Sequence, residues 1–79
     1  MEFKKSLLQI FEKETKLLKF VNEDTIFKSI EFEKKNFEYL ISKNILIKKL
    51  YSAIVRKLKI NDENFKKILY VYIELNFFK

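Results

Sequence analysis

The sequence predicts an all-α fold in which one small domain, residues 1–79, forms a bundle of four helices. Three observations predict this fold. Glycine and proline are both absent, so the residues that most often punctuate sheets and tight turns are missing. Apolar residues recur at helical spacing in four successive segments. Short breaks rich in asparagine and aspartate separate these segments, which favours neighbouring helices that pack against each other.

The composition is typical of a packed domain of modest stability. Hydrophobic residues make up 48% and charged residues 35% of the chain, which argues against disorder. A chain of this size buries only about 60–65% of the surface that its unfolded form exposes. Cysteine and histidine are absent, so disulfides and any thiolate or imidazole metal site are excluded. Self-association is the remaining ordinary way to supplement such a core.

The first segment, residues 2–21, predicts an amphipathic helix of about five turns. Its apolar stripe consists of Phe3, Leu7, Ile10, Phe11, Leu17, Leu18 and Val21. Asn22 or Asp24 follows, and the side-chain oxygen of either residue can accept the free amides at the start of the next helix.

The second segment, residues 25–42, predicts a helix whose core face carries Ile26, Phe27, Ile30, Phe37, Leu40 and Ile41. Phe32 and Tyr39 fall seven residues apart on its other side, which places them close together on a continuous helix. An exposed aromatic pair of this kind can contact a partner protein. The competing interpretation is that both rings pack under a neighbouring helix.

The third segment, residues 46–60, predicts a helix that follows a break at Lys43 and Asn44. With glycine missing, asparagine is the best available residue for a left-handed helix cap, so Asn44 is expected to have that role. The core face of this helix consists of Ile47, Leu50, Tyr51, Ile54, Val55 and Leu58. Residues 25–60 therefore predict two helices joined by a short turn, an arrangement similar to a helix-turn-helix pair.

The fourth segment begins after the clearest break in the chain, where Asn61 or Asp62 can cap a helix with acidic residues in its first turn. Nine of the eleven positions from 68 to 78 are apolar. A helix that is apolar nearly all round lies at the centre of a bundle or is shared between subunits, so a homo-oligomer formed through residues 65–78 is expected. Residues 69–78 also fit a strand with period two, and this alternative stays open.

All of the net charge lies in the second half of the chain. The net charge is +6, and residues 1–40 contain eight lysines and eight acids, whereas residues 41–79 contain nine basic residues and three acids. On a helical wheel of the third segment, one contiguous arc opposite the core face carries Lys48, Lys49, Ser52, Arg56 and Lys59. We call these five residues the basic face. Lys66 and Lys67 are expected to extend it.

A concentration of positive charge indicates a polyanionic partner. The leading hypothesis is a protein that docks the basic face onto nucleic acid or a nucleoprotein assembly, mostly through backbone phosphates. The alternative is a small inhibitor or immunity-type protein that binds an acidic protein surface, with Phe32 and Tyr39 as apolar anchors. An anionic lipid surface is a third partner of the same charge. Lysine outnumbers arginine sixteen to one, so A- and T-rich codon usage offers a competing explanation for the number of lysines.

No catalytic function is expected, because histidine and cysteine are both missing. Glu31, Glu33 and Glu38 diverge around the second segment, and Lys34 and Lys35 lie between them, which predicts a solvated face and no metal site. We expect no cofactor. No signal peptide is readable and no uncharged run exceeds six residues, far short of the roughly 20 that a transmembrane helix needs. An intracellular, cytoplasmic location is therefore expected.

Overall fold

The computed structural model describes residues 2–18, 21–39 and 42–78, with side chains from Lys5 onward. These ranges form four helices and contain no strand, which confirms the all-α prediction. The strand alternative for residues 69–78 is wrong, because all but the last of these residues belong to the last helix. The helices are α1 (Glu2–Leu17), α2 (Glu23–Phe37), α3 (Lys43–Lys57) and α4 (Glu63–Phe77).

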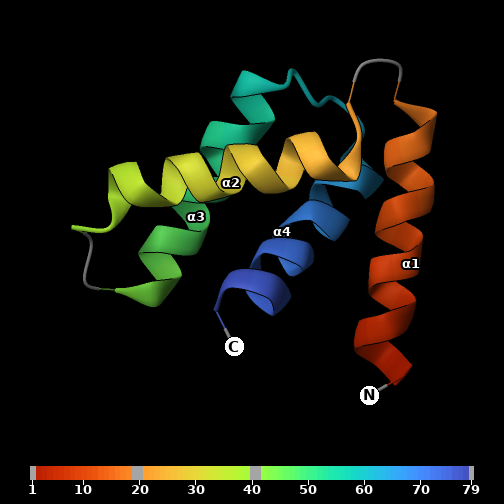
Figure 1. The fold of residues 1–79 in the computed structure, drawn as a ribbon, viewed down its shortest axis with the longest axis horizontal. Helices are drawn as coiled ribbons and strands as arrows, with labels where there is room; N and C mark the ends of the chain where they lie inside the picture. The colour runs from red at the N-terminus through yellow and green to blue at the C-terminus, as the bar shows by residue number, and fades with distance from the viewer. Residues whose placement is uncertain (1, 19–20, 40–41, 79) are drawn as a thin grey trace.

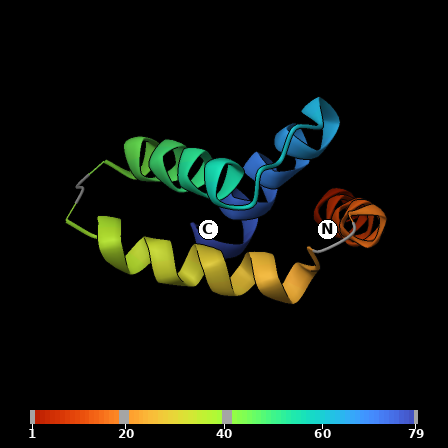
Figure 2. The same cartoon turned by 90° about the horizontal axis from the view of Figure 1, so that it is seen from above.

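Helix α4 occupies the middle of the molecule. It packs against α1 on one side and against α3 on the other, while α2 lies across the front in Figure 1. Figure 2 shows α2 and α3 running in opposite directions, with α1 seen end-on at the far end from the loop that joins them. Helix α1 contacts α4 and, to a lesser extent, α2. It lies at one edge of the bundle in Figure 1.

The central position of α4 accounts for its apolar composition. Phe65, Leu69, Tyr72 and Ile73 are buried, and most other apolar residues of α4 are partly buried against the same core. The apolar side chains that predicted self-association through residues 65–78 are thus largely buried against other helices of the same chain. Self-association through these residues stays a prediction.

A fully buried aromatic side chain anchors helix α1 in the core. Phe11 is fully buried, and its ring stacks on Tyr72 with centroids 3.9 Å apart and on Phe65 at 5.4 Å. The predicted apolar stripe is partly wrong, because Ile10 and Leu17 are 45% and 71% exposed. The inward side includes Leu8 and Thr15 in their place, whereas Phe11, Leu18 and Val21 pack on the core as predicted. The hydroxyl of buried Thr15 donates to the Glu12 carbonyl at 2.8 Å, which satisfies it. Phe3 lies outside the described side chains.

Side-chain caps set where the helices begin. Asn22 accepts a hydrogen bond from the Thr25 amide, and Asp62 accepts one from the Phe65 amide, each at 2.9 Å. Both caps were among the predicted residues. The break predicted at Lys43 and Asn44 is wrong, because Ser42 is the N-cap and both residues lie in the first turn of α3. The two helices of the predicted pair are thus α2 and α3, each ending several residues earlier than expected, and residues 40 and 41 of the linker lie outside the described ranges.

The left-handed cap is at Lys59 and not at Asn44. Lys59 is the one non-glycine residue of the described ranges with a positive φ, at 54°. Its amide donates to the Arg56 carbonyl at 3.4 Å, and the Ile60 amide donates to the Val55 carbonyl at 3.0 Å. This pair of bonds is the Schellman motif, and the buried Ile60 supplies the hydrophobic contact that accompanies it. The motif turns the chain from α3 toward α4.

Lys59→Gly is expected to stabilise the fold by about 1 kcal/mol, because a side chain with a Cβ is strained in the left-handed region and glycine is not. Urea unfolding followed by circular dichroism measures the change. Lys48→Gly, at an exposed position inside α3, is the matched control and should lose about 1 kcal/mol. A loss of stability in both variants would contradict the role assigned to Lys59.

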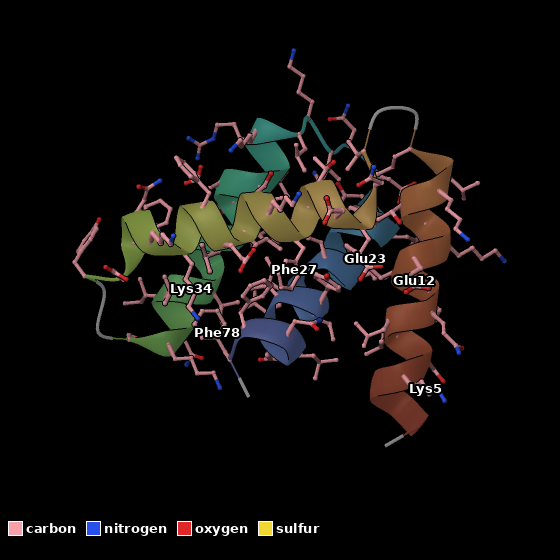
Figure 3. The ribbon with its side chains drawn as sticks, viewed as in Figure 1. Lys5, Glu12, Glu23, Phe27, Lys34 and Phe78 are labelled. Carbon is pink, nitrogen blue, oxygen red and sulfur yellow. The ribbon has the colours of Figure 1, made fainter. Side chains whose placement is uncertain are left out.

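The C-terminal end of α4 is held by a lysine of α2. Lys34 Nζ donates to the Phe77 carbonyl at 3.4 Å and lies 4.9 Å from the centre of the Phe78 ring. Figure 3 shows Lys34 and Phe78 near each other. A cation at this position complements the negative end of the helix dipole. Phe27 packs on Phe77 with ring centroids 4.9 Å apart. These contacts fix the position of α2 relative to the end of α4.

Candidate functional site

The basic face lies on α3 and on the turn that follows it. All five of its residues are exposed, because the opposite side of α3 supplies Leu46, Ile47, Leu50 and Ile54 to the core. The amphipathic pattern of the helix thus fixes the outward direction of the basic side chains. Lys57, which belongs to the same helix, points to a different side.

Two shallow hollows adjoin along the basic face, and Ser52 and Arg56 line both of them. The first, called the α2–α3 hollow, adds Lys48 and Lys49 together with Phe37, Ile45 and Ala53. The second, called the α3–α4 hollow, adds Tyr51, Val55, Lys59, Ile60, Asn61 and Lys66. Lys48, Lys49, Arg56, Lys59 and Lys66 therefore border one continuous surface.

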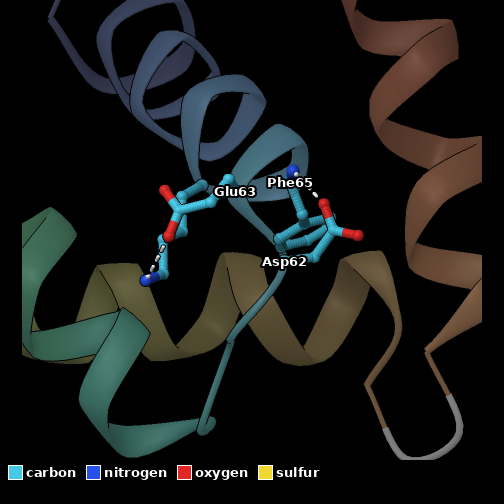
Figure 4. Close-up of polar contacts among 4 residues, drawn as sticks. Asp62, Glu63 and Phe65 are labelled. Carbon is cyan, nitrogen blue, oxygen red and sulfur yellow. Dashed lines mark hydrogen bonds and ion pairs between the residues drawn. The ribbon is translucent and has the colours of Figure 1, made fainter.

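The two lysines expected to extend the basic face differ in their placement. Lys66 lines the α3–α4 hollow, and its Nζ is 3.4 Å from Glu63 Oε1. Figure 4 shows this pair beside Asp62, whose carboxylate caps α4. Lys67 is exposed but lines neither hollow. Glu63 thus places a negative charge in direct contact with one cation of the candidate surface.

Acidic side chains leave the basic face largely unneutralised. Among the residues that the structure describes, Lys48, Lys49, Arg56 and Lys59 form no ion pair within 4.0 Å. Lys57 is the cation of α3 that does, with its Nζ 3.9 Å from Glu33 Oε1. Four cations with no ion-pair partner among the described residues, on α3 and the turn after it, create a local positive potential that exposed ion pairs would have reduced.

Phe32 and Tyr39 are not held together by one helix. Tyr39 lies in the turn after α2, which ends at Phe37, so the seven-residue spacing no longer places the rings on one helical face. Both are exposed, Phe32 by 59% and Tyr39 by 73%. Lys57 Nζ lies 5.0 Å from the centre of the Phe32 ring, a cation–π contact that occupies part of that ring.

Carboxylates gather on the side of the molecule where α1 meets α2. Tyr72 donates its hydroxyl to Glu23 Oε1 at 3.3 Å, and Figure 3 shows Glu12 close to Glu23. Partial burial, followed by the nearby charge of Glu12, raises the pKa of Glu23 above its usual value. Burial and the Glu23 charge likewise raise the pKa of the Tyr72 hydroxyl. Protonated Glu23 is favoured by folding, and this contribution to stability is lost as the pH rises through its folded-state pKa.

The described ranges 2–18, 21–39 and 42–78 contain no group of three or more histidine, cysteine or acidic side chains placed to hold a metal ion. None of the helices in these ranges combines the length and the apolar content that crossing a bilayer requires. No family model, curated protein or solved structure matches the chain. What the basic face can bind therefore follows from its charge and shape.

Sequence reasoning assigned Tyr51 to the core and overlooked Asn61 as part of a site. Tyr51 is half-buried and forms one wall of the α3–α4 hollow, with its ring against Tyr70 at a centroid distance of 5.5 Å. The wheel places Tyr51 correctly beside the core but cannot show that α4 starts next to it. The only signal in the sequence for a role of Tyr51 in the site was that it directly precedes Ser52, which was predicted to face outward.

Proposed function

We propose that the chain is a non-enzymatic binding protein that docks the basic face onto nucleic acid or a nucleoprotein assembly. The observation that carries this proposal is the set of exposed cations Lys48, Lys49, Arg56 and Lys59, which pair with no acid of the described ranges and border one surface together with Lys66. Lys48, Lys49 and Arg56 lie along α3 and Lys59 follows in the next turn, a spread that suits successive phosphates of a nucleic-acid backbone.

Contacts to phosphates are expected to dominate the binding free energy. Arg56 and Ser52 are the residues of the basic face suited to base edges. Binding should therefore show little sequence preference and a steep dependence on salt. If all five bordering cations reach phosphates of a duplex, the logarithm of the affinity should fall with the logarithm of salt concentration with a slope of about −4.5.

Fluorescence anisotropy with labelled duplexes of two unrelated sequences, titrated at several salt concentrations, tests the proposal. Similar affinities for both sequences and a slope near the stated value support it. Affinity that does not respond to salt, or weak binding at low salt both to these duplexes and to a single strand, would overturn it. Retention on heparin, measured in parallel, shows whether the basic face also binds a polyanion that is not a nucleic acid.

An inhibitor of an acidic partner protein is the alternative, and the exposure of Phe32 and Tyr39 favours it. In this case both aromatic rings would anchor the apolar part of an interface with that partner. Weak retention on heparin and on duplexes, combined with capture of one acidic protein that Phe32→Ala abolishes, would favour the alternative over the nucleic-acid proposal.

Glu63→Gln should increase the affinity for a duplex by a few-fold. Glu63 is 81% exposed and its carboxylate holds Lys66 at 3.4 Å, so its removal leaves Lys66 free to contact a phosphate and removes a repulsive charge. Anisotropy at low salt measures the gain. Asp24→Gln, which removes an equally exposed acid that pairs with Lys28 elsewhere on the surface, is the control and should change affinity much less. Equal gains in both variants would indicate an effect of net charge alone.

A further inference from the structure

Building on the proposed function, we propose that the preferred ligand is single-stranded nucleic acid and that the α3–α4 hollow receives one of its bases, stacked against Tyr51. The hollow combines an aromatic ring, apolar side chains and cations in one place. Sites that bind single strands have this combination, in which aromatic rings stack on bases and a basic groove follows the backbone.

The lining of the hollow matches the chemistry of a nucleobase. A base has two apolar faces and a polar edge. Tyr51, Val55 and Ile60 provide apolar surface, while the Ser52 hydroxyl and the Asn61 amide provide hydrogen-bonding groups. Arg56, Lys59 and Lys66 line the same hollow, within reach of the phosphates on either side of an inserted base.

The end of α3 and the start of α4 hold the lining of the hollow in place without a ligand. The Schellman motif at Lys59 and Ile60 ends α3, and the Asp62 cap starts α4 immediately afterwards (Figure 4). Tyr70 holds the Tyr51 ring edge-on, at an interplanar angle of 68°. A ring that is already oriented loses little conformational freedom on binding, which favours its use as a stacking surface.

A duplex cannot use this hollow, because its bases are stacked and paired inside the helix. It can contact the cations of the basic face through its phosphates alone. A single strand can make the same phosphate contacts and also place an unstacked base against Tyr51. The difference in affinity between a single strand and a duplex is therefore assigned to the Tyr51 side chain. Substitution of Tyr51 measures it.

Anisotropy titrations with a mixed-sequence single strand and with a duplex carrying the same number of phosphates test the inference. Tyr51→Leu keeps an apolar side chain against Tyr70 and removes the stacking ring, so it should weaken single-strand binding by about tenfold and duplex binding very little. Tyr51→Phe should bind as the unaltered protein does. Tyr39→Leu, which removes a tyrosine outside the hollow, is the matched control.

A single strand with abasic sites gives a second measurement that requires no change in the protein. It should bind about tenfold more weakly than the intact strand, because its phosphates remain and its bases are missing. Equal affinities for intact and abasic strands, or equal losses for single strand and duplex in Tyr51→Leu, would overturn the inference and leave the proposed function standing. Failure of every nucleic acid to bind at low salt would instead overturn the proposed function.

Discussion

Phe11→Ala is expected to lower the free energy of unfolding by about 3–5 kcal/mol, the range for removing a fully buried phenylalanine. Phe11 is the buried apolar residue of α1, and its ring lies on both Tyr72 and Phe65 of α4. A chain of this length has a total stability of roughly 4–12 kcal/mol. The substitution therefore removes a large share of it and should release α1 from α4.

Urea unfolding measures this effect, and amide hydrogen exchange shows whether α1 opens first. Ile10→Ala is the control, because Ile10 is the adjacent apolar residue of the same helix and is 45% exposed. Its substitution should change stability by about 1 kcal/mol or less. Equal losses at both positions would show that α1 is not attached to α4 through Phe11.

Reversing the charge of Lys49, Arg56 and Lys59 together should abolish binding to nucleic acid, with a loss of at least about 100-fold at low salt. The three residues are exposed and belong to the basic face, so the fold should survive with a change in stability of about 1 kcal/mol. The reason for the loss is local: acids would then occupy the positions at which phosphates are expected.

A second triple variant separates this local effect from net charge. Reversal of Lys5, Lys13 and Lys35 changes the net charge of +6 by the same amount, and all three lysines are exposed outside the two hollows. Binding should weaken far less than in the first variant. Equal losses in the two variants would show that diffuse charge, and no particular surface, attracts the ligand.

Local chemistry made much of the fold predictable. Asn22 and Asp62 mark helix starts because their side-chain oxygens accept amides three residues ahead and acids follow them. The exposure of the basic face follows from the amphipathic pattern of one helix. The start of α3 was missed because Lys43 and Asn44 resemble a break, whereas the hydroxyl of Ser42 forms the cap.

Tertiary geometry explains what the sequence could not show. Ile10 and Leu17 were expected to be buried but are exposed, because α1 lies at the edge of the bundle and only a narrow stripe around Phe11 is covered. The α3–α4 hollow depends on the left-handed conformation of Lys59, and a lysine gives no signal for it. The role proposed for Tyr51 became visible only once the two helices were placed side by side.

A titration followed by two-dimensional 15N–1H NMR tests most directly the claim that the basic face is the binding surface. Addition of a single-stranded oligonucleotide at low salt should shift the backbone amides of residues 48–61 and of Lys66 most, and those of α1 least. The largest shifts on α1, or around Glu12 and Glu23, would contradict the account, as would a spectrum that does not change.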